Sequence, residues 1–200
     1  MKLAIVGADA RAWGNIPNGE KKAREKIKEI IVGHGSSFQE PDRSTISFDG
    51  VVIVSGHCPQ GGVDIWAEEI AKELGIKTEI YPAEVHQWND KIIPRISPFM
   101  NVVGNPKLKG YRSRNIQIAK ACDVLYDIEP ASSCKYCRGT GYLSKGVFTP
   151  KHLTKPYIPS VGVAPIICPK CEGDGAYSGG TWTLKYARKL GKKVHKVIIT

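Results

Sequence analysis

The sequence has no long hydrophobic run, and this absence bears first on membranes and secretion. No window approaches the roughly 20 apolar residues of a membrane-spanning helix, and the N-terminal MKLAIVGADARAW has too short an apolar run for a signal peptide. Hydrophobic residues make up 42% and charged residues 24% of the 200 residues, which is ordinary for a globular protein. We therefore expect a cytoplasmic protein with no membrane partner, built as one α/β domain or as one domain with a small accessory module.

Acidic residues are scarce relative to basic ones. The sequence has 19 Asp and Glu against 29 Lys and Arg, a formal net charge of +10. This excess favours an anionic partner such as a nucleotide, a nucleic acid or phosphate. The alternative is that lysines simply keep the surface solvated, since in EKKAREKIKEI the acids alternate with the bases. Composition leaves nucleic-acid binding open, and it leaves homo-oligomerisation open as well.

Cysteines are few and unevenly placed, which argues against a disulfide framework. Of the six, Cys58 and Cys122 stand alone and four form two Cys-x-x-Cys pairs. In a chain without a recognisable secretory signal, paired cysteines favour a metal over disulfides. The alternatives are four free cysteines or a redox pair.

The two cysteine pairs share one longer motif, C-x-x-C-x-G-x-G, at residues 134–141 and 168–175. Two residues between cysteines let both thiolates meet one ion, and the glycines permit the positive φ that such turns need. Four thiolates close a tetrahedral shell, so we expect a structural zinc ion rather than a catalytic one. Its predicted ligands are Cys134, Cys137, Cys168 and Cys171. The motif resembles half of the cysteine-rich region of DnaJ-type chaperones, but no J-domain signature accompanies it, so no chaperone function is implied.

These motifs interrupt an otherwise regular α/β pattern. The flanking stretches CDVLYDIEP and SGGTWTLKYARKLGKKVHKVII read like consecutive pieces of one domain, whereas the segment between the motifs has little periodicity. Structural zinc contributes apparent binding energies of about 10–16 kcal/mol, enough to fold such a piece. We therefore predict a Rossmann-like domain over residues 1–130 and 179–200, and a zinc-binding insertion over residues 131–178 that forms a basic flap.

Hydrophobic periodicity predicts alternating strands and helices in the rest of the chain. Apolar or β-branched runs predict strands at residues 2–6, 51–56, 77–83, 123–128 and 192–199. Apolar residues at helical spacing predict helices at residues 20–32, 63–74, 111–122 and 180–190. Residues 83–110 read as an irregular loop over the active face. This alternation favours an α/β fold with a Rossmann-like, doubly wound parallel sheet.

Three glycine-rich loops follow predicted strands and precede helices, where open parallel sheets bind ligands. Glycines let the backbone approach a phosphate, and helix N-termini attract it. Such turns are often purely structural, but three in one small domain favour a phosphate ligand. The candidate residues in these loops are Gly7, Gly56, Gly61, Gly62, Asp64, Gly179, Gly180 and Thr181.

A fourth candidate element is GYRSRN, which places Arg112, Arg114 and Asn115 at or near a helix N-terminus. Cations there are unfavourable for the helix dipole, which makes sense if Arg114 meets an anion. The alternative is a surface arginine.

Together these segments resemble the SLOG superfamily. VVIVSG, GGVDIWAEEIAKELGI, YPAE, RSRN, ACDVLYDI and SGGTWTLKYARKLGKKV occur in the order seen in that superfamily, whose members include YspA-like proteins, the DNA-processing protein DprA and the lonely-guy phosphoribohydrolases. The resemblance covers nearly all the chain outside residues 130–178 and is best for the YspA-like branch. It implies a Rossmann-like domain that binds nucleotides or nucleotide-derived ligands at the strand carboxyl ends.

Two departures from that superfamily concern catalysis and the second loop. The phosphoribohydrolases carry a glutamate three residues after the threonine of their Gly-Gly-Thr turn, where this sequence has Leu184. Relative to the DprA-like Ser-Gly loop, SGHCPQGGVD is about two residues longer.

No catalytic residue is assigned, because no spacing forms a recognisable acid–base pair. The candidate groups near the predicted site are His57, Asp64, Glu84, His86 and Glu129. Three functions stay open: nucleotide binding, N-glycosidic hydrolysis of a nucleoside monophosphate with a non-standard carboxylate, and nucleic-acid or protein binding led by the zinc flap.

Overall fold

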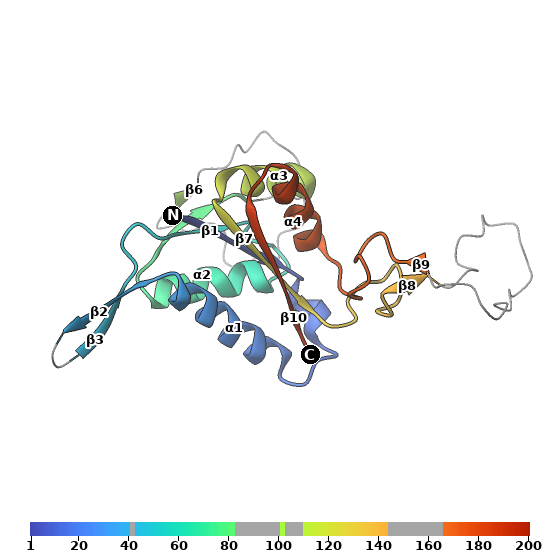
Figure 1. The fold of residues 1–200 in the computed structure, drawn as a ribbon, viewed down its shortest axis with the longest axis horizontal. Helices are drawn as coiled ribbons and strands as arrows, with labels where there is room; N and C mark the ends of the chain where they lie inside the picture. The colour runs from blue at the N-terminus through green and yellow to red at the C-terminus, as the bar shows by residue number, and fades with distance from the viewer. Residues whose placement is uncertain (41–42, 83–100, 103–109, 144–165) are drawn as a thin grey trace, which may run out of the picture.

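A parallel β-sheet covered by helices on both faces forms the body of the protein (Figure 1). The structure is a computed structural model, and it describes residues 1–40, 43–82, 101–102, 110–143 and 166–200. The sheet strands are β1 (Lys2–Gly7), β4 (Val52–Ser55), β5 (Lys77–Ile80), β6 (Asn101–Val102), β7 (Val124–Pro130) and β10 (Lys193–Ile199). The helices are α1 (Gly19–Gly33), α2 (Val63–Glu73), α3 (Gly110–Ala121), α4 (Gly179–Lys189) and the short 3₁₀ helix η1 (Ala10–Trp13).

The strand order is β10-β7-β1-β4-β5-β6, and every neighbouring pair is parallel. The chain builds outward from β1 through β4, β5 and β6, then returns to the other side of β1 with β7. The order therefore reverses between β1 and β7. In open α/β sheets a ligand binds at such a switch point, outside the carboxyl ends of the strands. The predicted Rossmann-like, doubly wound sheet is confirmed.

The first hydrophobic core lies between the sheet and the layer formed by α1 and α2. The two helices pack together and bury apolar residues at helical spacing, including Ile27 and Ile31 on α1 and Ala67 on α2. Trp13 of η1 meets Trp66 of α2 edge to face, with ring centroids 5.5 Å apart. Aromatic pairs favour this geometry, and here it attaches the loop after β1 to α2.

The second core lies on the opposite face, under α3 and α4. Ile118 on α3 and Leu184 on α4 pack with the side chains of Ala4, Val54 and Leu125 from the sheet. Helices cover both faces of the sheet, so side chains on both sides of each central strand are buried. This explains why these strands are near-continuous apolar runs in the sequence. Among the described residues, no helix combines the length and apolar character needed to cross a membrane.

Two features of the fold differ from the sequence-based expectations. A hairpin of β2 (Ser36–Glu40) and β3 (Arg43–Ser47) projects from one end of the molecule, where no strands were predicted (Figure 1). Residues 83–110 were predicted to be irregular, yet Asn101–Val102 form β6 and pair with β5. The rest of residues 83–109 lies outside the described residues.

The cysteine motifs project from the other end of the molecule (Figure 1). There, β8 (Tyr142–Leu143) and β9 (Ile166–Ile167) pair antiparallel just after the first motif and just before the second. We call residues 132–143 and 166–177 the cysteine module.

Candidate functional site

The four motif cysteines converge on one point in the cysteine module. Their Sγ atoms all lie within 4.8 Å of one another, and all four side chains are buried. The Cys134–Cys168 Sγ distance is 4.0 Å and the Cys137–Cys171 distance is 3.6 Å. With Zn–S bonds of about 2.3 Å, a tetrahedron has edges of about 3.8 Å. The cluster therefore has the donors and the dimensions of a four-thiolate zinc site, and none of these cysteines forms a disulfide.

The two motifs hold each other in a reciprocal arrangement. The Cys134 N–H donates to the Gly175 carbonyl at 2.8 Å, and the Cys168 N–H donates to the Gly141 carbonyl at 2.9 Å. Each motif thus closes on the last glycine of the other. Neither half is complete alone.

The motif glycines are required by backbone conformation and by close approach. Gly141 and Gly175 have φ of 77° and 76°. A β-carbon on Gly141 would overlap the backbone of Gly173, and one on Gly175 would overlap that of Gly139. The glycines of C-x-x-C-x-G-x-G therefore let the two turns pack against each other around the cysteines.

One thiol of the cluster is predisposed to ionise. Burial disfavours the Cys137 thiolate, but the Gly141 N–H donates to its Sγ at 3.3 Å and the neighbouring thiols donate as well. These donors lower the pKa of Cys137 to about 7. Burial raises the pKa values of Cys134 and Cys171, so ionisation of all four thiols requires a bound cation.

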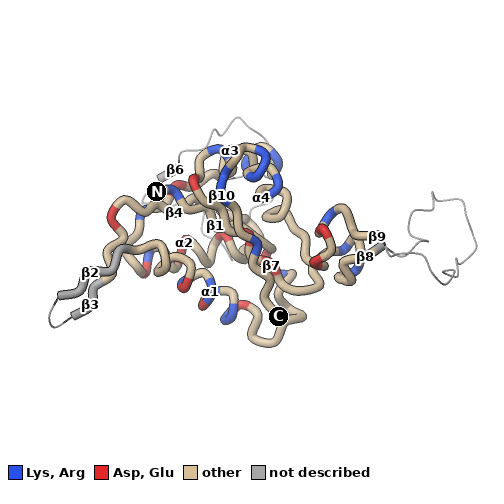
Figure 2. Tube along the Cα trace, in the orientation of Figure 1, with Lys and Arg blue, Asp and Glu red and all other residues tan. Residues whose placement is uncertain are grey.

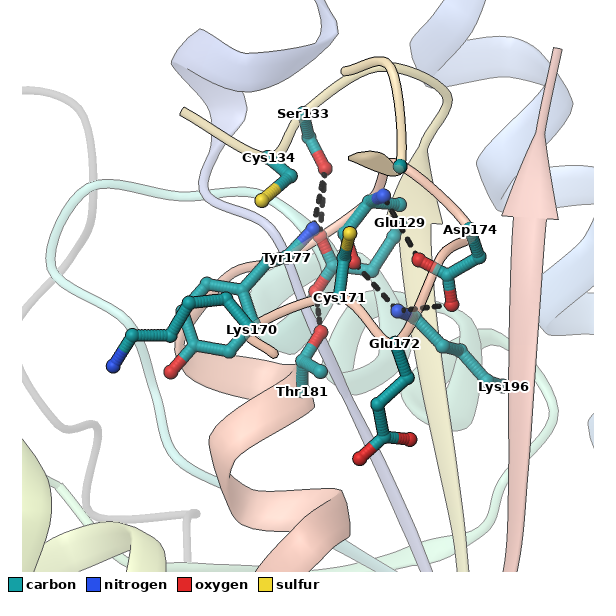
Figure 3. A network of polar contacts seen from close by, with 12 residues as sticks. Glu129, Ser133, Cys134, Lys170, Cys171, Glu172, Asp174, Tyr177, Thr181 and Lys196 are labelled. Atoms are coloured by element: carbon teal, nitrogen blue, oxygen red, sulfur yellow. Dashed lines mark hydrogen bonds and ion pairs between the residues drawn. The ribbon is translucent and has the colours of Figure 1, made fainter. Parts of the chain in front are cut away.

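The second motif is attached to the main domain by charged contacts. Lys196 of β10 donates to Asp174 at 2.7 Å and to the Ala176 carbonyl at 2.5 Å (Figure 3). Lys185 of α4 pairs with Glu172 at 3.0 Å and donates to the Lys170 carbonyl at 2.6 Å. The module therefore contacts the last helix and the last strand of the sheet.

A buried carboxylate connects the module to the start of α4. Glu129, at the end of β7, is fully buried and accepts from the hydroxyls of Ser178, of Thr181 at 3.3 Å and of Ser133 at 3.4 Å (Figure 3). Ser178 is also the N-cap of α4, where its Oγ accepts from the Gly180 N–H at 2.9 Å. Burial raises the pKa of Glu129, against the lowering effect of its hydrogen-bond donors.

Two of the glycine loops pack directly against the loop after β1. A β-carbon on Gly180 would overlap the Oδ1 atom of Asp127 and would lie 2.6 Å from the Cα atom of Gly7. A β-carbon on Gly62, whose φ is 94°, would overlap the Ala8 carbonyl. The three loops that the sequence singled out therefore meet around the carboxyl end of β1.

Arg114 joins α3 to the loops at the carboxyl edge. Its side chain is 9% exposed, and its Nη1 atom lies 3.4 Å from Asp64 Oδ2 and 3.3 Å from the Gly56 carbonyl. Its Nε donates to Asn115 Oδ1 at 3.0 Å, and Asn115 donates to the Gly179 carbonyl at 3.3 Å. The predicted residues from the β4 loop, α3 and α4 thus form one chain of contacts.

Asp64 is the acidic member of this chain. Burial raises its pKa to about 6, although the neighbouring Arg114 acts in the opposite direction. Its carboxylate is ionised above that pH and then compensates the charge of Arg114.

Two predicted residues lie apart from this chain. Arg112 is exposed, with its guanidinium 5.9 Å from the centre of the Trp182 ring on the outer surface of α3 and α4. Gly61 belongs to the turn after β4, with φ of 75° and its N–H donating to the Cys58 carbonyl at 3.0 Å. Glu84 and His86 lie outside the described residues.

His57 belongs to a buried polar cluster beneath the β4 loop. Its Nδ1 lies 2.7 Å from Glu68 Oε2, and Glu68 also accepts from the Ser55 hydroxyl. His57 has a positive φ of 47°, so a non-glycine residue takes a turn conformation here. Sequence reasoning missed Glu68, although an acid four residues after Asp64 on the apolar side of a helix was a usable signal.

Asp127 is a second residue that the sequence reasoning missed. It is fully buried beneath Gly180, and within the described part of the chain no group lies in hydrogen-bonding geometry with either carboxylate oxygen. Burial and the nearby Glu129 raise its pKa well above the ordinary value. The signal was two acids at alternate positions, Asp127 and Glu129, at the end of an otherwise apolar strand.

The sheet, its two helical layers and the projecting cysteine module define a Rossmann-like α/β protein. No protein-family model matches the sequence, and curated proteins give no match. Among solved structures, DNA processing protein A (DprA) from Streptococcus pneumoniae is similar, with a TM-score of 0.50 and 16% identity over 98% of this chain and 49% of that chain. The protein TM1055 is similar over 64% of this chain and 59% of that chain, with a TM-score of 0.42 and 15% identity. The chain spans about half the length of DprA, and at this identity the likeness shows a shared fold.

Proposed function

We propose that the protein binds a nucleotide or a nucleotide-derived phosphate ligand at the carboxyl edge of the sheet, next to the switch point between β1 and β7. The observation that carries this proposal is the convergence there of three glycine turns with a buried arginine from α3. Turns and helix N-termini at this position are suited to bind phosphate. The SLOG resemblance and the DprA-like fold support the same ligand class.

The contacts of Arg114 indicate how an anion would bind. Its guanidinium is already near Asp64, so a phosphate would compete with that carboxylate or join it around the same cation. Arg114 also contacts the Gly56 carbonyl and Asn115, which fix the direction of the guanidinium before the ligand arrives. Little side-chain entropy is then lost on binding.

We also propose that Cys134, Cys137, Cys168 and Cys171 hold a structural zinc ion. The Sγ spacing, the burial and the N–H donor to Cys137 all support it. Four thiolates leave no open coordination position, so the ion would stabilise the cysteine module rather than act on a substrate.

We propose that residues 131–178 form a separate unit inserted into the Rossmann-like domain of residues 1–130 and 179–200. The reciprocal contacts of the two motifs support this division. Ser178, at its boundary, caps α4 and therefore serves both parts.

The phosphoribohydrolase alternative would need a carboxylate that differs from the one in the lonely-guy enzymes. At the place of that glutamate, Leu184 is 2% exposed and packs in the second core. Asp127 and Glu129 are the carboxylates beside the Gly-Gly-Thr turn, and both are buried. Binding without turnover is therefore the function that we favour.

A second candidate is nucleic-acid binding, and the distribution of charge favours it. Helices α3 and α4 contain no acidic residue and carry only cations, whereas acids and bases are interspersed along α1, and α2 is mainly acidic (Figure 2). The exposed cations of this basic layer are Arg112, Lys120, Arg188 and Lys189. The rings of Trp182 and Tyr186 stack on each other on α4, with their centroids 5.5 Å apart. Bases stack on such rings in complexes of proteins with single-stranded nucleic acid.

Mass spectrometry of the natively purified protein tests the first proposal directly. We expect a retained phosphate-containing nucleotide or nucleotide derivative at about one per chain. Incubation with nucleoside monophosphates and chromatography of the products then separates binding from hydrolysis, because release of free base would support the enzyme alternative. If nothing is retained and calorimetry with a panel of nucleotides shows no heat of binding, the proposal is wrong.

A further inference from the structure

Glu129 contacts both the start of the cysteine module and the first turn of α4. From the module it accepts a hydrogen bond from the hydroxyl of Ser133, the residue before Cys134. From α4 it accepts the hydroxyls of Ser178 and Thr181. Both parts therefore share one buried carboxylate at the end of β7.

The position of Ser133 depends on the two cysteine motifs being held together. Its Oγ accepts from the N–H of Tyr177, which follows the second motif, at 3.1 Å. The neighbouring Cys134 N–H donates to the Gly175 carbonyl at 2.8 Å. These bonds join chain segments more than 40 residues apart, and the four buried cysteines are the centre around which they form.

We propose that metal occupancy of the four-cysteine centre fixes the first turn of α4, with Glu129 as the positioning residue that connects them. When the thiolates are gathered, Ser133 and Tyr177 lie side by side, and Ser178 follows Tyr177 directly into its cap position. When the centre is empty, no metal–sulfur bonds hold the two motifs together, and they separate more readily. Glu129 then loses the Ser133 donor, and Ser178 is no longer held from its N-terminal side.

The ion pairs that join the module to α4 and β10 are partly or largely exposed on their acidic side. Glu172 is 56% exposed in its pairs with Lys185 and Arg188, and Asp174 is 30% exposed in its pair with Lys196. Exposed ion pairs contribute little to stability. The described apolar cluster of the module consists of the four cysteines themselves with Tyr177 packed against them.

The inference concerns the Gly179–Gly180–Thr181 turn whichever ligand it binds. It rests on the four-cysteine centre and not on the proposed nucleotide. Failure of the nucleotide proposal would leave it standing.

Hydrogen exchange of backbone amides tests the connection, because exchange reports local opening. Zinc-loaded protein is compared with protein treated with a chelator. We expect chelation to accelerate exchange of the amides of residues 179–183 at least tenfold. Helix α2 packs on the opposite face of the sheet from α4 and serves as the reference. Exchange of the amides of its residues 66–72 should change less than twofold.

Substitution of Ser133 separates this connection from general unfolding. Ser133→Ala removes the hydroxyl between the module and Glu129 but keeps every cysteine. We expect full zinc content, raised exchange at residues 179–183 before chelation, and a smaller response to the chelator. The matched control is Ser132→Ala at the exposed neighbour, which should behave like the natural protein. Glu129→Gln provides a second variant, because its amide keeps only one acceptor oxygen.

Two results would overturn the proposal. One is loss of protection at Cys134 and Cys168 on chelation with no change at residues 179–183. The other is an unchanged chelator response in both Ser133→Ala and Glu129→Gln.

Discussion

The guanidinium of Arg114 and the carboxylate of Asp64 form a buried pair, with Nη1 and Oδ2 3.4 Å apart. The pair joins the N-terminal parts of α3 and α2 at the carboxyl edge of the sheet. Burial raises the pKa of Asp64 to about 6. Both groups are therefore charged at neutral pH, whereas only Arg114 is charged in mild acid.

The first prediction follows from the titration of Asp64. Protonation below about pH 6 removes the negative charge that compensates Arg114, so the affinity for an anion should rise as the pH falls from 7.5 to 5.5. A nucleotide phosphodiester is the proper probe, because its own charge is constant over this range. Calorimetry should show a flat profile for Asp64→Asn and an unchanged profile for Glu69→Gln on the same helix. A natural protein that binds equally at both pH values would contradict the role given to Arg114.

The second prediction concerns Arg114 itself. Arg114→Ala removes a charge-assisted hydrogen bond worth roughly 1.5–3 kcal/mol, so nucleotide affinity should fall about ten- to a hundredfold. Because the change leaves Asp64 buried and unpaired, unfolding must be measured alongside binding. Arg112→Ala is the matched control on the same helix, since that side chain is exposed over Trp182. An equal loss in both variants would place the ligand on the outer surface of α3.

The third prediction concerns stability at Gly180. A β-carbon there meets Asp127 and Gly7, so Gly180→Ala should lower the free energy of unfolding by about 1–3 kcal/mol, as overpacking does. The residue is therefore a poor probe of binding alone, although the turn lies at the proposed site. Gly33→Ala is the control, because nothing lies within 4 Å of a β-carbon at that position. Urea denaturation at fixed pH measures both, and an unaffected Gly180→Ala protein would show that the helix start can move.

The fourth prediction concerns metal content. Elemental analysis should give one zinc ion per chain, and the cobalt-substituted protein should show the spectrum of four thiolate ligands. Serine at any motif cysteine should reduce the metal content and loosen the module. Serine at Cys58 or Cys122 should not, because those thiols lie outside the cluster. A cobalt spectrum with fewer than four thiolates would refute the proposed ligand set.

The fifth prediction separates the two candidate functions. Lys120→Glu and Lys189→Glu reverse exposed charges on the basic layer, and should weaken oligonucleotide binding and reduce its salt dependence. The same reversal at Lys21 on α1 is the control, because Lys21 follows Glu20 and pairs with Glu25 there. Binding of a mononucleotide should be unaffected by all three changes. If the α1 variant loses as much oligonucleotide affinity as the α4 variant, attraction is non-specific.

Local patterns explain why much of the fold was predictable from sequence. The helix expected at residues 63–74 is Val63–Glu73, because its apolar residues recur at helical spacing and Gly75 ends it. The β2–β3 hairpin was missed because SSFQE and RSTIS are mostly polar and their sequences do not alternate apolar with polar residues. The two-residue strand β6 is too short to carry any pattern.

The candidate site was predictable only where the sequence repeats a motif of known chemistry. The cysteine cluster follows from the spacing of two identical motifs. The pairing of Arg114 with Asp64 and of Glu129 with Ser178 does not, since each pair is about 50 residues apart and forms through the sheet topology. Arg112 and Arg114 look alike in RSRN, yet only Arg114 points into the protein.

The reciprocal closure of the two cysteine motifs has a consequence for the connection between them. The first cysteine of each motif donates its N–H to the carbonyl of the last glycine of the other motif, and β8 pairs with β9 just after the first motif and just before the second. Closing a chain of twice the length costs only about 0.6 kcal/mol more. Foreign sequence inserted between Leu143 and Ile166, such as an affinity tag or a second domain, should therefore leave the four-cysteine cluster intact.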